Sequence, residues 1–150
     1  MDLALLVEHT YVSNQLQSEE DVQKLAQLGV KHIMCNRPNG EEAHQVGFEQ
    51  VAAWAQNAGM SVTHLPVVMN QMGMNDVAEF AKWFAQYEGE TKALYCRTGT
   101  RSSLLWALSQ VEIGQVTAVE AIQTVAKAGR NISGAAMMLQ QLEPQPHKNA

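Results

Sequence analysis

Several features are missing from this chain of 150 residues, and each absence excludes a class of protein. It has only two cysteines, Cys35 and Cys96, which lie far apart and do not form the cysteine framework of a small secreted domain. The formal net charge is −5, and no basic block or aromatic-rich basic stripe occurs. A nucleic-acid surface is therefore not expected.

Long apolar runs and metal-ligand patterns are also missing. The apolar run over 3–7 has no basic flank and is too short for a signal peptide or a membrane span. The five histidines show no metal-ligand spacing with cysteines or acids. We therefore expect a cytoplasmic protein with no membrane partner, no metal and no cofactor. The sequence leaves the oligomeric state open.

The composition is that of an ordinary globular domain. Apolar residues make up 46% of the chain and charged residues 17%. A length of 150 residues is enough to bury one core. We expect a single domain over 1–143, followed by a polar tail over 144–150 that contains Pro144 and Pro146.

Strand-like and helix-like segments alternate along the chain. The strand-like runs cover 7–12, 31–35, 61–68 and 92–96, the first as a short edge strand or hairpin. Helical patterns cover 19–28 (capped by Ser18 and stopped by Gly29), 45–57, 75–87, 102–112, 118–128 and 133–142. This alternation predicts an α/β fold, with a mainly parallel central sheet flanked by helices. The last three helices are expected to cover one face of the sheet.

The most informative segment runs from Leu94 to Ser103, where a strand ends, a tight turn follows and a helix begins. Backbone N–H groups converge at such a turn, and the helix N-terminus adds partial positive charge. Cys96 should therefore ionise more easily than a free thiol and act as a nucleophile. We expect Arg101 to grip an anion with its two-pronged guanidinium, and Gly99 to supply a positive φ or a close backbone approach. Thr98 and Thr100 complete the anion-binding turn.

Other side chains near this turn each have more than one reading. Arg97 either contacts the anion or faces water, and Ser102 either donates a hydrogen bond to Cys96 or caps the helix. Arg37 follows a strand, so it projects from the same edge of the sheet as a substrate-binding, supporting or surface arginine. Cys35 is either a resolving thiol for Cys96 or, as we favour, a small core residue.

The pattern Cys-x-x-Gly-x-Arg-Ser, set between a strand and a helix, resembles the active-site loops of two enzyme groups. In cysteine-dependent phosphatases the thiolate attacks phosphorus, and in rhodanese-like sulfurtransferases it carries sulfur as a persulfide. Phosphatase loops have five residues between cysteine and arginine. Cys96 and Arg101 enclose four, as in many rhodaneses.

The chain as a whole resembles one bacterial family over roughly residues 5–140. The family is the phosphatase-like domain found alone or fused to metallo-β-lactamase-type hydrolases, whose members have been labelled both phosphatase and sulfur transferase. The resemblance implies a dual-specificity-phosphatase-like fold. It rests on Tyr11-Val12-Ser13 with Gln15, Gly29-Val30, Cys35-Asn36-Arg37-Pro38 followed by Glu41-Glu42, and the run from Tyr95 to Ser103.

The general acid that such a phosphatase needs is hard to find. The segment where the resemblance places it, 69–76, offers Asp76 alone, and Asp76 reads better as a first-turn helix residue. Sulfur transfer from thiosulfate needs no such acid. Three functions stay open: a phosphatase acting through a Cys96 phospho-enzyme, which we place first, a sulfurtransferase carrying a Cys96 persulfide, and a non-catalytic anion-binding module. The expected partner is a small anion, either a phosphate ester or a thiosulfate-like sulfur donor.

Overall fold

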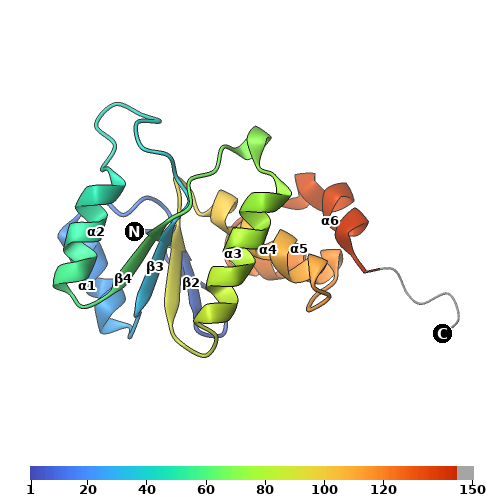
Figure 1. Cartoon of the computed structure of the whole chain (residues 1–150), viewed down its shortest axis with the longest axis horizontal. Coiled ribbons are helices and arrows are strands. Elements are labelled where there is room, and N and C mark those ends of the chain that lie inside the picture. Colours follow the sequence, from blue (N-terminus) through green and yellow to red (C-terminus); the bar gives the residue numbers. More distant parts are fainter. Residues whose placement is uncertain (145–150) are drawn as a thin grey trace, which may run out of the picture.

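A central sheet of five strands organises the molecule, as the computed structural model of residues 1–144 shows (Figure 1). The strand order is β1-β2-β5-β3-β4. β1 pairs antiparallel with β2, and every other pairing is parallel. The strands are β1 (Ala4–Val7), β2 (Thr10–Ser13), β3 (His32–Cys35), β4 (Ser61–His64) and β5 (Lys92–Tyr95).

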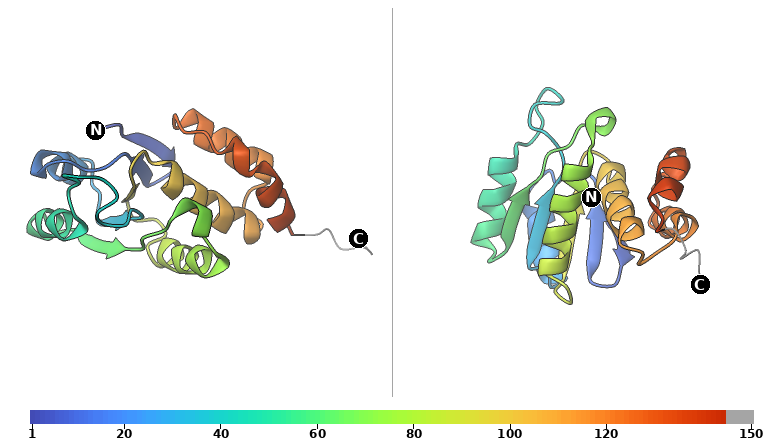
Figure 2. Two further views of the ribbon diagram at one scale, coloured as in Figure 1. Left: turned by 90° about the horizontal axis from the view of Figure 1, so that it is seen from above. Right: turned by 45° about the vertical axis from the view of Figure 1, so that its right-hand side comes forward.

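Helices cover both faces of the sheet (Figure 2). One core, which includes Leu25, Ile33 and Val51, lies between the sheet and α1 and α2. A second core, which includes Phe80 and Leu105, lies between the sheet and α3 and α4, and it extends to α5 and α6. The helices are α1 (Glu19–Gln27), α2 (Phe48–Asn57), α3 (Met74–Gln86), α4 (Thr100–Glu112), α5 (Ala118–Lys127) and α6 (Ala136–Leu142), with 3₁₀ turns at Met69–Gln71 and Ser133–Ala135.

The predicted α/β fold with a mainly parallel sheet is confirmed, and its details differ at several element ends. The N-terminal segment is a hairpin of two strands, so the sheet has one strand more than the four runs suggested. β4 ends at His64, two residues before Pro66, which has no N–H to donate to a ladder. The final three helices share their side of the sheet with α3, which packs against α4.

Four helix starts differ from the sequence prediction. α2 begins at Phe48 rather than at residue 45, and α6 begins at Ala136, after a 3₁₀ turn, rather than at residue 133. α3 begins at Met74 with Gly73 as its N-cap, rather than with a cap at Asn75 and Asp76. α4 begins at Thr100, two residues before the predicted start. The predicted cap of α1 is confirmed, since the Ser18 hydroxyl accepts a hydrogen bond from the Asp21 N–H.

The order of the strands brings two distant segments together. β5 lies between β2 and β3, and Cys35 is in register with Tyr95. Asn36 and Cys96 therefore leave neighbouring strands side by side, and the Asn36 N–H donates to the Tyr95 carbonyl at 2.8 Å. We call this side of the sheet, where the parallel strands end, the carboxyl edge.

Within residues 1–144, none of the helices is long and apolar enough to cross a membrane. Residues 145–150, most of the predicted polar tail, lie outside the described part of the chain.

Candidate active site

The Cys96 loop, residues 96–101, forms the centre of the site at the carboxyl edge. Gly99 has a φ of 90° and is the N-cap of α4. Its N–H points back at the cysteine and donates to Cys96 Sγ at 3.1 Å. Cys96 itself is buried, and this N–H is the donor that faces its sulfur. The predicted positive φ of Gly99 is confirmed.

Hydrogen bonds from serines and an asparagine hold the loop in place. Ser102 Oγ donates to Asn36 Oδ1 at 2.7 Å, so Ser102 neither contacts the sulfur nor caps α4. Asn36 in turn donates to the Leu65 carbonyl, which ties the end of β3 to the segment after β4. Ser103 Oγ donates to the Gly99 carbonyl at 2.8 Å. Polar contacts, two of them buried, thus link the loop after β5 to the end of β3 and to the segment after β4.

Arg101 lies in the first turn of α4, with one side of its guanidinium bound to the protein. Nη1 donates to Glu41 Oε2 at 2.9 Å and to the Val67 carbonyl at 2.8 Å, and Nη2 donates to Glu41 Oε1 at 3.1 Å. Within residues 1–144, Nε of Arg101 has no acceptor at hydrogen-bond distance. The Nε side therefore stays available for an anion, while Glu41 fixes the opposite side.

Glu41 also binds Arg37, so one carboxylate bridges two arginines. Arg37 Nε donates to Glu41 Oε1 at 2.9 Å, and Arg37 Nη1 donates to Gln15 Oε1 at 3.0 Å. Hydrogen bonds from Arg101 hold the pKa of Glu41 below its ordinary value, and those from Arg37 add to this against the opposing effect of burial. Glu41 is therefore an ionised support for Arg101.

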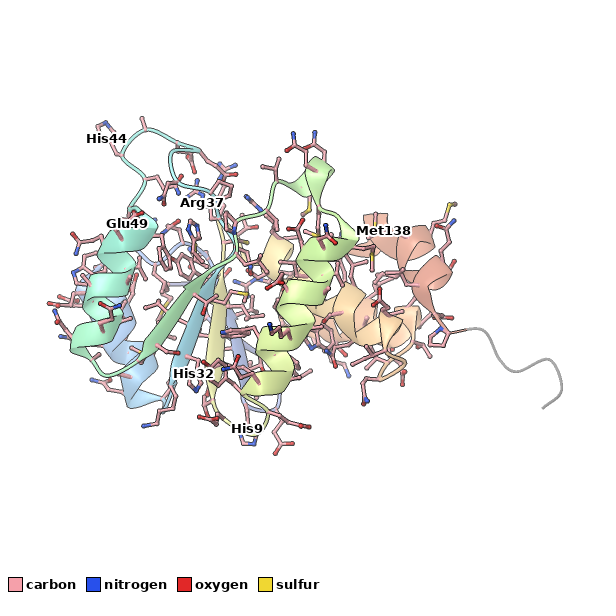
Figure 3. The ribbon with its side chains drawn as sticks, viewed as in Figure 1. His9, His32, Arg37, His44, Glu49 and Met138 are labelled. Carbon is pink, nitrogen blue, oxygen red and sulfur yellow. The ribbon has the colours of Figure 1, made fainter. Side chains whose placement is uncertain are left out.

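Arg37 and Arg97 lie in different surroundings. Arg37 is buried, not on the surface, and all three of its nitrogens bind Gln15, Glu41 or Glu42. Its guanidinium therefore supports Glu41 and Glu42 from the protein side, and a contact of Arg37 with substrate stays a prediction. Figure 3 places Arg37 where the loop after β3 meets the sheet, with His44 at the outer end of that loop. Arg97 points largely into solvent and pairs with Glu42 at 3.1 Å.

The two threonines of the loop lie on its outer side. Thr98 Oγ1 donates to Thr100 Oγ1 at 3.0 Å, and Thr98 is exposed. The Thr100 N–H donates to Thr98 Oγ1 at 3.4 Å, so the Thr98 N–H is the backbone donor of this pair that the turn could direct at an anion.

Cys35 is a core residue, as predicted. It is buried in the core between the sheet and α1 and α2. Its sulfur accepts a hydrogen bond from the backbone N–H of Arg37 at 3.4 Å. Burial raises the pKa of Cys35 to about 11. The thiol is therefore neutral near neutral pH, which makes it a slow resolving group.

Asp76 serves the start of α3. Its Oδ2 accepts a hydrogen bond from the Gly73 N–H at 3.0 Å, the capping contact that the sequence favoured. The segment before it, Met69–Gln71, forms a 3₁₀ turn with an exposed Met69. No other carboxylate occurs in this segment.

Two supporting residues escape the sequence prediction. Glu41 stood in the family pattern without a role, although its spacing of four from Arg37 allows an ion pair. Arg130, in the turn between α5 and the following 3₁₀ turn, donates from Nε to the Thr98 carbonyl at 3.1 Å. A lone arginine after a helix gives no sequence signal for such a contact.

Comparisons with known proteins agree with this geometry. Residues 2–113 match the family described as "Beta-lactamase hydrolase-like protein, phosphatase-like domain". A beta-lactamase hydrolase-like protein of Xylella fastidiosa is 31% identical over 116 residues, which are 77% of this chain and 26% of that protein. The chain thus spans about a quarter of the length of the curated relatives that it matches first.

Solved structures show the same architecture. A protein of Neisseria meningitidis described as a candidate phosphatase is 35% identical, with a TM-score of 0.85 over 95% of this chain and 99% of its own. Tk-PTP is 15% identical, with a TM-score of 0.73 over 95% of this chain and 96% of its own, and it supports the fold alone. The chain therefore belongs to the phosphatase-like domain family of the beta-lactamase hydrolase-like proteins, and its fold is that of the protein tyrosine phosphatases.

Proposed function

We propose that this chain is a cysteine-dependent phosphatase whose nucleophile is Cys96. The observation that carries the proposal is the Gly99 N–H aimed at the Cys96 sulfur, beside the free Nε side of Arg101. In the first step a bond forms between Sγ and phosphorus while the bond from phosphorus to the leaving oxygen breaks. In the second step water attacks the phosphocysteine, and the thiolate leaves with its electron pair.

Arg101 has the role of stabilising the phosphoryl oxygens. Negative charge on these oxygens shifts during transfer, and a fixed guanidinium with two parallel donors suits them. Glu41 and the Val67 carbonyl hold the Nη1 side, so Arg101 loses little side-chain freedom when substrate binds.

Proton supply limits the range of substrates. Glu41 is ionised by its two arginines, and Asp76 is engaged in the cap of α3. General acid catalysis contributes about 10²–10⁴-fold in rate. We therefore expect turnover of esters whose leaving group departs as a stable anion, such as aryl phosphates, and slow turnover of alkyl phosphates.

A rhodanese-type sulfur transfer is the second candidate. The four residues between Cys96 and Arg101 and the engaged carboxylates both favour it. Here Cys96 Sγ attacks the outer sulfur of thiosulfate, sulfite leaves with the electron pair of the S–S bond, and a persulfide remains. The step needs no acid, because sulfite is a stable anion.

One experiment separates these reactions. The purified protein is incubated with thiosulfate or with an aryl phosphate, and intact mass and phosphate release are measured beside a Cys96→Ser control. We expect phosphate release that the control lacks. A stable gain of one sulfur atom without phosphate release would replace the phosphatase with the sulfurtransferase. With neither signal, the anion-binding module would stand.

A further inference from the structure

Arg130 is buried and lies against the Cys96 loop. Its three nitrogens donate to three backbone carbonyls from three parts of the chain: Nε to Thr98 at 3.1 Å, Nη1 to Ala128 at 2.9 Å and Nη2 to Asp2 at 2.6 Å. The guanidinium also fits closely against the loop. A Cβ on Gly99 would lie 2.7 Å from Arg130 Nε, so only glycine leaves room for this contact.

One peptide unit connects Arg130 with the nucleophile. In a planar trans peptide the C=O and the N–H point to opposite sides. The Thr98 carbonyl accepts from Arg130, and the N–H of the same unit, on Gly99, donates to Cys96 Sγ at 3.1 Å. A rotation of this peptide would break both hydrogen bonds at once.

We propose that Arg130 is a positioning residue that orients and polarises the Thr98–Gly99 peptide, so that the Gly99 N–H stabilises a thiolate on Cys96. The proposal rests on the proposed function, because it requires Cys96 to work as a thiolate. Arg130 acts through the peptide and touches neither the sulfur nor a substrate.

The charge of Arg130 strengthens this effect. The nearest carboxylate, Asp2 Oδ2, is 3.6 Å away and belongs to a largely exposed side chain, whereas the Arg130 side chain is 2% exposed. Hydrogen bonds in series polarise one another, and a low local dielectric increases the effect. A buried cation at the carbonyl end of the peptide therefore makes the N–H at the other end a better donor to an anion.

Other charged and titratable groups near Cys96 stay unchanged when Arg130 is replaced. These are Arg97 and Arg101 on the loop and α4, Arg37 and Cys35 at the end of β3, and Glu41 and Glu42 on the loop that follows. A change in thiolate formation in an Arg130 variant thus reflects either the hydrogen bond to the Thr98 carbonyl or the charge of Arg130, and Arg130→Gln, which has an amide donor but no charge, separates the two.

The test measures the rate of Cys96 alkylation by iodoacetamide from about pH 5 to about pH 10, in a Cys35→Ala background so that one thiol reacts. Arg130→Met and Arg130→Gln are compared with Lys127→Met, which removes a cation from the exposed end of α5 and leaves the loop untouched. We expect the midpoint of the profile to rise by about one pH unit in Arg130→Met, which is about tenfold less thiolate on the acidic side. The midpoint for Arg130→Gln should lie between those of the parent and Arg130→Met, and the midpoint for Lys127→Met should equal that of the parent.

The outcomes separate the two proposals. A parent profile like that of a free cysteine contradicts the thiolate itself, and with it the proposed function. If the alkylation profile of the parent has a low midpoint and both Arg130 variants have the same midpoint, the role of Arg130 is overturned and the proposed function is not. If both variants fail to fold, the Arg130 Nε–H resonance of the parent decides: a shift that follows the Cys96 titration supports the proposal, and a constant shift overturns it.

Discussion

Two segments leave the carboxyl edge on either side of β3, the Cys96 loop after β5 and residues 65–73 after β4, and they are held in different ways. The Cys96 loop is braced by two buried partners, Asn36 through Ser102 and Arg130 through Thr98, and by the more exposed Glu41 through Arg101. The segment over 65–73 is held at Leu65, at the buried Val67 and at Gly73, and Met69 between them is exposed. Binding an anion requires fixed donors, so the braced loop is where we propose that the chemistry takes place. The open segment supplies no positioned acid.

Gly99→Ala should have the largest effect on the reactivity of Cys96, because the substitution lies in the Cys96 loop itself. Alanine at a φ of 90° is strained by about 1–2 kcal/mol, and its Cβ would meet Arg130 Nε at 2.7 Å. We expect the Gly99 N–H to turn away from the sulfur and Cys96 alkylation near neutral pH to slow by about 10-fold or more. Gly129→Ala, also at positive φ but with open space around it, is the control for backbone strain. Equal alkylation rates in the two variants would contradict the close fit of Gly99.

Glu41→Gln should have the next largest effect. Glutamine keeps one acceptor for Arg101 but loses the charge, so we expect aryl phosphate turnover to fall by about tenfold. Glu79→Gln, the same change at an exposed position of α3, should leave turnover unchanged. Turnover that does not fall in Glu41→Gln would mean that Arg101 needs no support.

The same variant gives a pH test of the ion pairs. The pKa of Glu41 is lowered in the folded protein, so its stabilising contribution is complete above the ordinary carboxyl value and disappears as the pH falls through the folded value. The difference in unfolding free energy between the parent and Glu41→Gln should therefore be constant at neutral pH and shrink in acid. Urea unfolding at several pH values measures it. A difference that grows in acid would contradict the ionised state.

Asp76→Asn tests the open segment and should affect turnover little. Loss of the carboxylate cap on Gly73 should lower stability by about 0.5–1 kcal/mol. We expect aryl phosphate turnover within about twofold of the parent, because Asp76 serves the helix. A loss approaching the 10²-fold scale of general acid catalysis would make Asp76 the acid.

Cys35→Ala should have the smallest effect, seen only in alkali. The pKa of Cys35 is raised to about 11, so the contribution of its neutral thiol is complete below the ordinary value of 9.0 and is lost as pH rises through about 11. The parent should lose more stability than Cys35→Ala over that interval. A reversible Cys35–Cys96 disulfide in the oxidised parent would instead give Cys35 the resolving role.

Sequence reasoning reached the fold and the centre of the site because both depend on local patterns. The turn between a strand and a helix fixed the place of Cys96, Gly99 and Arg101, and the alternation of strands brought Asn36 and Arg37 to the same edge. The partners of these residues could not be predicted. Ser102 binds Asn36 across 66 positions, Arg101 binds Glu41 across 60, and Arg130 binds Thr98 across 32, and only the packed fold sets such pairs.

The contact between Arg130 and Asp2 has a practical consequence for handling the protein. The same guanidinium that supports the Cys96 loop also grips the backbone of residue 2, whose N–H is itself bound to Asn14. A tag or fusion joined just ahead of residue 2 therefore acts on the contact between Asp2 and Arg130, and through Arg130 on the Cys96 loop. Activity should therefore be compared between tags at the two ends before any low rate is attributed to the chemistry.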